Sequence, residues 1–237
     1  VLEADGVRLR GLNPAYTQIL INGERIPAGG ADRAFFVDRI PAELIERVEI
    51  VRSNSANRSG DALAGAINIV LRDAYALDGG YVRAGVIAFD DGEIKSTIGG
   101  VFGTAVGEGR LLLGANRQER YNPKVKFSQR FDQPGGTLEN IEDQTDTRDG
   151  VDTSFNFAYQ TPLAGGDLEL SGLFVRTDRY EDEDSIEYRS GIRNDANLLT
   201  INDNDTDIVT DNWFLRGRYE FETAMGETTV KLGYAVF

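Results

Sequence analysis

The 237-residue chain has no histidine and no cysteine, so carboxylates, tyrosine, lysine and serine are its only groups for acid–base or nucleophilic chemistry. The usual zinc sites, thiol nucleophiles, disulfides and Ser-His-Asp triads are therefore excluded. Its 39 acidic and 25 basic residues give a net charge of −14, which repels nucleic-acid phosphates and disfavours nucleic acid as a partner. Most enzyme classes are disfavoured as well.

The many carboxylates leave two chemical hypotheses. Paired Asp and Glu could hydrolyse glycosides, and this alternative stays open although no pair lies in a recognisable motif. The segment DNDTD, Asp203–Asp207, resembles the first half of a calcium loop, but Ile208 and Phe214 stand where that loop needs Gly and Glu. We expect a solvated acidic loop there, and neither a metal, a cofactor nor a catalytic residue in the chain.

Acidic residues gather in three segments that are poor in apolar side chains. These segments, 139–152, 178–187 and 195–211, are predicted to be long polar loops. Between them the pattern has period two. Phe155 and Phe157 share one parity, and Ser154 and Asn156 share the other. Such alternation predicts seven strands, near 80–89, 94–104, 109–121, 150–161, 167–180, 207–222 and 227–237.

The predicted connections alternate between short turns and long acidic loops, which is typical of an outer-membrane barrel with periplasmic turns and extracellular loops. The period-two aromatic residues would then form its lipid-facing band. A soluble β-sandwich is the alternative that this pattern leaves open. No apolar run reaches the length of about 18 residues that a membrane helix needs.

Residues 1–78 differ from the rest of the chain in charge balance and in sequence pattern. They carry 11 acidic and 9 basic side chains, whereas residues 79–237 carry 28 and 16, which predicts a domain boundary near residues 78–80. Asn22-Gly23 lies between two alternating runs and predicts a hairpin with a type I′ turn. A short helix from Pro41, a strand from Arg47, a helical turn closed near Gly65 and a strand over 66–72 complete a small mixed α/β unit.

Four blocks in this unit carry a family resemblance. VRLRGL, ILINGERIP, IPAELIERVEIVR and GDALAGAINIVLR, in this order and spacing, resemble the second half of the plug domain of TonB-dependent outer-membrane receptors. The match covers about residues 7–72. The chain departs from the family pattern at Ser53-Asn54, where Gly-Pro is common, and at Ser59, where an aromatic residue is common.

The resemblance implies a mainly β fold. Residues 1–78 would be the C-terminal part of a plug, and residues 79–237 the first seven strands or so of an incomplete barrel of about 22 strands. It also implies a ligand-gated importer in the bacterial outer membrane for a siderophore, vitamin or oligosaccharide. The energy would come from the TonB-ExbB-ExbD complex, which acts on an N-terminal segment that this sequence lacks, and the barrel would contact outer-membrane lipid.

The resemblance also suggests site residues. Ligand would meet plug loops that face outward, at Arg10, Leu12, Asn13, Ala28, Gly29, Gly30 and Arg33, although Arg10 could equally pair with a plug carboxylate. In the strand after Arg47, Val48 and Ile50 would point into the plug core. The charged residues of this strand would face the barrel wall across a polar, wet interface without much apolar burial; they are Arg47, Glu49 and Arg52.

Overall fold

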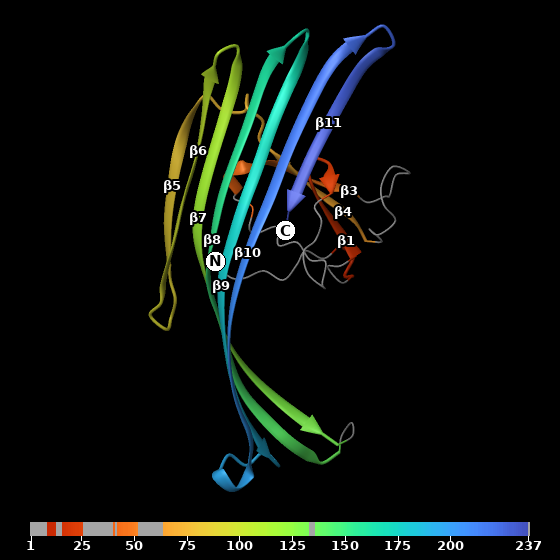
Figure 1. Ribbon diagram of the computed structural model, residues 1–237. Coiled ribbons are helices and arrows are strands. Elements are labelled where there is room, and N and C mark those ends of the chain that lie inside the picture. Colours follow the sequence, from red (N-terminus) through yellow and green to blue (C-terminus); the bar gives the residue numbers. More distant parts are fainter. Residues whose placement is uncertain are drawn as a thin grey trace.

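The computed structural model describes residues 9–12, 16–25, 40, 42–51, 64–132 and 136–236. They form two antiparallel or mixed sheets with no α-helix in the described ranges (Figure 1). The smaller, N-terminal sheet has the strand order β2-β1-β4-β3, and the larger sheet has seven strands in the order β11-β10-β9-β8-β7-β6-β5. Within the described residues, no helix has the length and hydropathy to span a membrane.

The N-terminal sheet follows the sequence patterns closely. β1 (Thr17–Ile21) and β2 (Glu24–Arg25) flank Asn22 and Gly23, whose φ angles of 50° and 80° are those that the predicted type I′ turn needs. The segment after Pro41 forms one 3-10 turn, η3 (Ala42–Leu44). β3 (Ile45–Val51) and β4 (Gly65–Leu71) are the two remaining strands, with β4 parallel to β1 and antiparallel to β3.

The seven predicted strands of the larger sheet are confirmed, all antiparallel to their neighbours. They are β5 (Gly79–Ala88), β6 (Ile94–Val106), β7 (Gly109–Phe131), β8 (Leu138–Leu163), β9 (Gly166–Arg189), β10 (Leu198–Thr223) and β11 (Gly226–Val236). Two-residue turns join β6 to β7, β8 to β9 and β10 to β11 at the same end of the sheet (Figure 1).

The prediction of long acidic loops is wrong. β7 and β8 pair almost without interruption from the short turns out to Phe131 and Leu138, and β9 and β10 pair out to Tyr188 and Leu198. The acidic segments are therefore the distal halves of these strands, here called the strand extension, and they project beyond the β5–β6 hairpin (Figure 1). The backbone ladder needs no apolar face, so it continues where period-two hydrophobicity stops.

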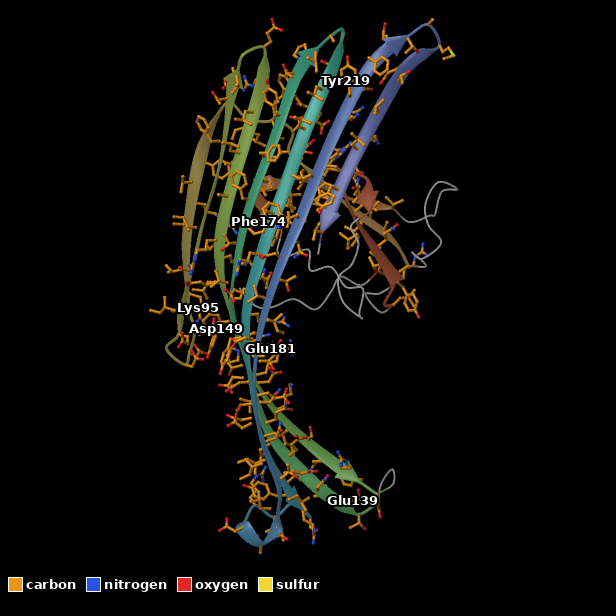
Figure 2. The ribbon with its side chains drawn as sticks, in the orientation of Figure 1. Lys95, Glu139, Asp149, Phe174, Glu181 and Tyr219 are labelled. Carbon is orange, nitrogen blue, oxygen red and sulfur yellow. The ribbon has the colours of Figure 1, made fainter. Side chains whose placement is uncertain are left out.

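Alternation of faces in the larger sheet agrees with the sequence. In β8, Ser154 and Asn156 are 3% and 4% exposed on the side of the N-terminal sheet, whereas Phe155 is 47% exposed on the other side. Phe174, labelled in Figure 2, shares this outward face with Trp213, and their ring centroids are 4.3 Å apart. The sheet thus has an inner face toward the N-terminal sheet and an outer face rich in exposed apolar side chains.

Candidate functional site

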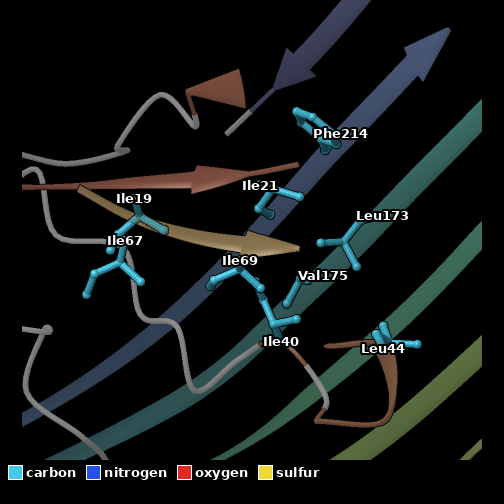
Figure 3. Close-up of a cluster of buried hydrophobic side chains, with 9 residues drawn as sticks. All are labelled: Ile19, Ile21, Ile40, Leu44, Ile67, Ile69, Leu173, Val175 and Phe214. Carbon is cyan, nitrogen blue, oxygen red and sulfur yellow. The ribbon is translucent and has the colours of Figure 1, made fainter. Parts of the chain in front are cut away.

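The seam between the two sheets is the candidate functional site, and an apolar cluster lies at its centre. Six side chains of the N-terminal unit pack against three from the inner face of β9 and β10 (Figure 3). The nine residues are Ile19, Ile21, Ile40, Leu44, Ile67, Ile69, Leu173, Val175 and Phe214. Burial of this kind contributes about 1.5–3 kcal/mol for each large apolar side chain. The seam therefore holds the N-terminal sheet by hydrophobic contact.

The expected wet interface without apolar burial is accordingly wrong at this position. The sequence does contain a sign of this apolar contact, because the alternation of apolar and polar residues breaks at two places. Leu173, Phe174 and Val175 are three consecutive apolar residues in β9, and Trp213, Phe214 and Leu215 are three in β10. Consecutive apolar residues put apolar side chains on both faces of a strand. Here one parity meets the N-terminal sheet and the other forms the outer face.

A glycine in β7 lets the 3-10 turn approach the wall. A Cβ atom on Gly114 would come 2.6 Å from Cδ2 of Leu44 and would also collide with the side-chain amide of Asn156. Beside this contact, the segment after β4 packs on the inner face through a second small cluster, formed by Ala74, Leu77, Val101, Leu112 and Ala158.

A polar pocket of about 380 Å³ lies between the two sheets on the side of the short turns. Arg216 and Arg218 of β10 line it from the wall, and Asn22 and Asn68 line it from the N-terminal sheet. Arg216 donates a hydrogen bond of 3.4 Å to the carbonyl oxygen of Asn22, across the seam. The seam is thus mixed: an apolar centre with a polar pocket beside it.

The structure places the residues predicted to contact the barrel wall as follows. Arg47 donates to Glu46 and Glu49 at 2.8 and 2.9 Å and also lines the polar pocket. Glu49 accepts a bond of 2.8 Å from the Asn68 amide. Arg52 lies outside the described residues. Direct contact of these three side chains with the wall stays a prediction.

The prediction that Val48 and Ile50 point into the plug core holds for the face of the sheet but not for burial. They pair with Ile69 and Ile67 and so lie on the apolar face of the sheet, yet they are 55% and 58% exposed. The reason is that β3 is an edge strand, and the wall residues of the apolar cluster cover β1 and β4 beside it.

Two of the predicted ligand-contacting residues lie in the described part of the chain. Arg10 is exposed with a positive φ of 56°, and Leu12 is 41% exposed in the same turn. Asn13, Ala28, Gly29, Gly30 and Arg33 lie outside the described residues. The assignment of all seven to ligand binding therefore stays a prediction.

Beyond the seam, the inner face of the sheet becomes charged and internally paired. Asp152 is buried between Arg120, to which it is bonded, and Thr177, which donates at 2.7 Å. Farther out, Asp146 accepts from Lys126 at 2.8 Å and from Arg148 at 3.2 Å. Burial would raise the pKa of Asp146, but these two cations lower it below its ordinary value.

The outer face of the strand extension is acidic. Asp182 pairs with Asp205 and Asp184 with Asp203 across β9 and β10. Desolvation and these neighbouring carboxylates raise the pKa of Asp182. The DNDTD segment lies in β10 and is not a loop, so its aspartates alternate with residues of the opposite face and do not encircle an ion. Within the described residues, no group of three or more acidic side chains is placed to hold a metal ion.

The N-terminal part of the chain matches a known domain family. Residues 2–66 match the family model described as the TonB-dependent receptor plug domain. Among solved structures, a variant of the ferric enterobactin receptor from Pseudomonas aeruginosa, in complex with enterobactin, is 14% identical with a TM-score of 0.40. The likeness covers 94% of this chain and 41% of that one. The plug match identifies a plug domain of the TonB-dependent receptor type in this part of the chain, whose described strands form a small sheet seated on the inner face of the larger antiparallel sheet.

Proposed function

We propose that the chain is part of an active importer of the bacterial outer membrane, in which the N-terminal unit is the plug and the larger sheet is part of the barrel. The observation that carries the proposal is the plug match over residues 2–66 together with the seat of that unit on the inner face of β9 and β10. Residues 1–78 act as the plug segment and residues 79–237 as the barrel segment.

The seam explains how such a plug can be both sealed and movable. Three wall residues, Leu173, Val175 and Phe214, hold it by apolar contact, and on one side a polar pocket adjoins that contact. Among the described residues, a pull on the plug has to separate this apolar patch, the small cluster around Ala74 and a weak bond from Arg216 to a backbone oxygen. In this proposal the TonB-ExbB-ExbD complex supplies the pull.

The ligand is a siderophore, a vitamin or an oligosaccharide, and it meets the plug at the turn of Arg10 and Leu12 and at the predicted loop that contains Gly29, Gly30 and Arg33. If Arg10 binds ligand, Arg10→Ala in the full-length parent weakens ligand binding without lowering the amount of folded receptor. A parallel fall of receptor and uptake would give Arg10 a structural role.

A cross-link across the seam tests the importer directly. Ile21 of the plug and Phe214 of the wall belong to the same cluster (Figure 3). Cells that produce the full-length parent should accumulate one class of a labelled panel of ferric siderophores, cobalamin and maltooligosaccharides. A proton uncoupler should abolish that accumulation, and so should a short thiol cross-link between Ile21→Cys and Phe214→Cys. Uptake that survives the cross-link would contradict movement of the plug along this wall.

A further inference from the structure

The outer face of the larger sheet carries a shallow apolar groove with a volume of about 760 Å³. Its floor is made by the small residues Gly100 and Ala115, which are paired neighbours on β6 and β7. Val82 and Phe155 continue the same row on either side, and Ile98 and Phe102 are exposed along its edges. The groove is lined mostly by apolar groups, which suits a hydrocarbon chain.

One end of the groove, on the side of the strand extension, carries arginine. Arg117, Thr153 and Arg176 are register partners in one row across β7, β8 and β9. This row lies one step beyond the row of Ala115, Phe155 and Phe174. The arginine side chains are 50% and 48% exposed.

These two arginines stand out from their surroundings. By strand parity, Arg117 and Arg176 are the only basic residues on the outward positions of β7–β10. Arg117 bonds Glu119 at 3.0 Å, but that carboxylate also accepts from the backbone and side chain of Ser96. Arg176 lies 3.6 Å from Asp211. A guanidinium has five N–H donors, so each keeps donors for another oxygen ligand.

The rows beyond the arginines fix the depth at which an anion can sit. Asp178, Asp182 and Asp205 follow on the outward positions of β9 and β10 and would repel a phosphate placed farther out. Toward the short turns the outward positions of β7–β10 are mostly apolar and carry no basic side chain. Only the row of Arg117, Thr153 and Arg176 combines positive charge, a hydroxyl and an adjoining apolar groove.

We propose that this face binds one anionic phospholipid-like molecule, with its phosphate at Arg117, Thr153 and Arg176 and an acyl chain in the groove over Gly100 and Ala115. The inference rests on the proposed placement of the larger sheet in the outer membrane. It adds a lipid site that is separate from the seam and from the ligand-contacting turns of the plug.

The test uses the full-length parent purified in dodecyl maltoside, with phosphatidylglycerol and phosphatidylcholine of identical acyl chains as probes. Native mass spectrometry counts bound lipid, and a melting curve reports stabilisation. Wild-type protein should bind phosphatidylglycerol in preference to phosphatidylcholine. Arg117→Gln with Arg176→Gln should reduce that preference by about tenfold, because each basic residue at a membrane surface attracts anionic lipid.

Matched variants distinguish the effect of arginine charge on lipid binding from the effects of groove shape and of folding. Arg130→Gln changes an exposed arginine on the same strand far from the groove and should leave the preference intact, as should the charge-conserving pair Arg117→Lys and Arg176→Lys. Ala115→Phe fills the floor of the groove and should lower binding of both lipids. Equal binding of the two lipids by wild type, an unchanged preference in the glutamine pair, or equal stabilisation by inorganic phosphate would overturn the lipid site.

The readout needs no transport. Lipid preference that persists in a receptor that imports nothing would leave the lipid site standing while the importer proposal fails. Uptake that persists in a protein without lipid preference would give the reverse result.

Discussion

At the scale of single residues, Gly114 is a position at which the turn that carries Leu44 approaches the wall closely. A β-carbon there would press on the side chains of Leu44 and Asn156, which are buried in the packed seam and have little room to move. We expect Gly114→Ala in the full-length parent to loosen the plug. The backbone amide of Ile69 should then exchange hydrogen faster, and a lower concentration of urea should detach the plug from the wall. Gly217→Ala is the control, since its new methyl would meet only Leu170 at 3.5 Å. Equal exchange in both variants would contradict a tight seat.

Asp146 should make the stability of the strand extension depend on pH. Its pKa in the fold is lowered by Lys126 and Arg148, so its stabilising contribution is complete above the ordinary aspartate pKa of about 4 and is lost as the pH falls through the lowered value. The distal β7–β8 hairpin should therefore be equally protected from hydrogen exchange at about pH 7 and 5 and should loosen only below about pH 4.

The substitution Asp146→Asn should produce that loosening at neutral pH. Asp184→Asn is its opposite control, because Asp184 lies on the acidic outer face and its charge helps to raise the pKa of Asp182. Removal of that charge should protect the β9–β10 hairpin slightly or leave it unchanged. Equal loosening by both variants would mean that the pairing of Asp146 does not hold the extension.

At the scale of elements, labelling of β8 tests which face would meet lipid in the proposed barrel. Single cysteines at Ser154 and Asn156 should react slowly with a water-soluble maleimide, since both positions are buried against the plug side. Cysteine at Phe155 should prefer a lipid-soluble maleimide, because that position is exposed on the apolar outer face. The absence of native cysteine from this chain keeps the background low. Uniform labelling along the strand would reject the assignment of faces.

At the scale of the whole molecule, the topology predicts an orientation. Met225 lies in a short turn at one end and is 98% exposed, and Asp182 lies in the strand extension at the other. In the full-length parent, cysteine at 182 should react with an impermeant reagent on intact cells. Cysteine at 225 should react only after the outer membrane is permeabilised. If cysteine at 225 reacts on intact cells and cysteine at 182 does not, the proposed orientation of the barrel in the membrane is reversed.

The architecture of the whole molecule also predicts how the isolated chain behaves in water. β5 and β11 are the edges of the larger sheet in this chain, and its outer face exposes many large apolar side chains. Unpaired edges and a broad apolar face promote association in water. The isolated 237-residue chain should aggregate without detergent. A monodisperse monomer that melts cooperatively in detergent-free buffer would favour a soluble domain.

The sequence by itself determined what is local. The Asn22-Gly23 turn, the seven strands and the opposite faces of Ser154 and Phe155 could be predicted, because turn geometry and strand alternation each depend on neighbouring residues. The plug blocks could be recognised as well, because each is a short stretch of consecutive residues. Only the tertiary structure showed that the acidic segments continue as strands, because a hydrogen-bonded ladder leaves no hydrophobic pattern when both faces are polar. It also decided where the plug sits: Leu173 and Phe214 meet Ile21 across more than a hundred residues of chain, and no local pattern encodes that contact.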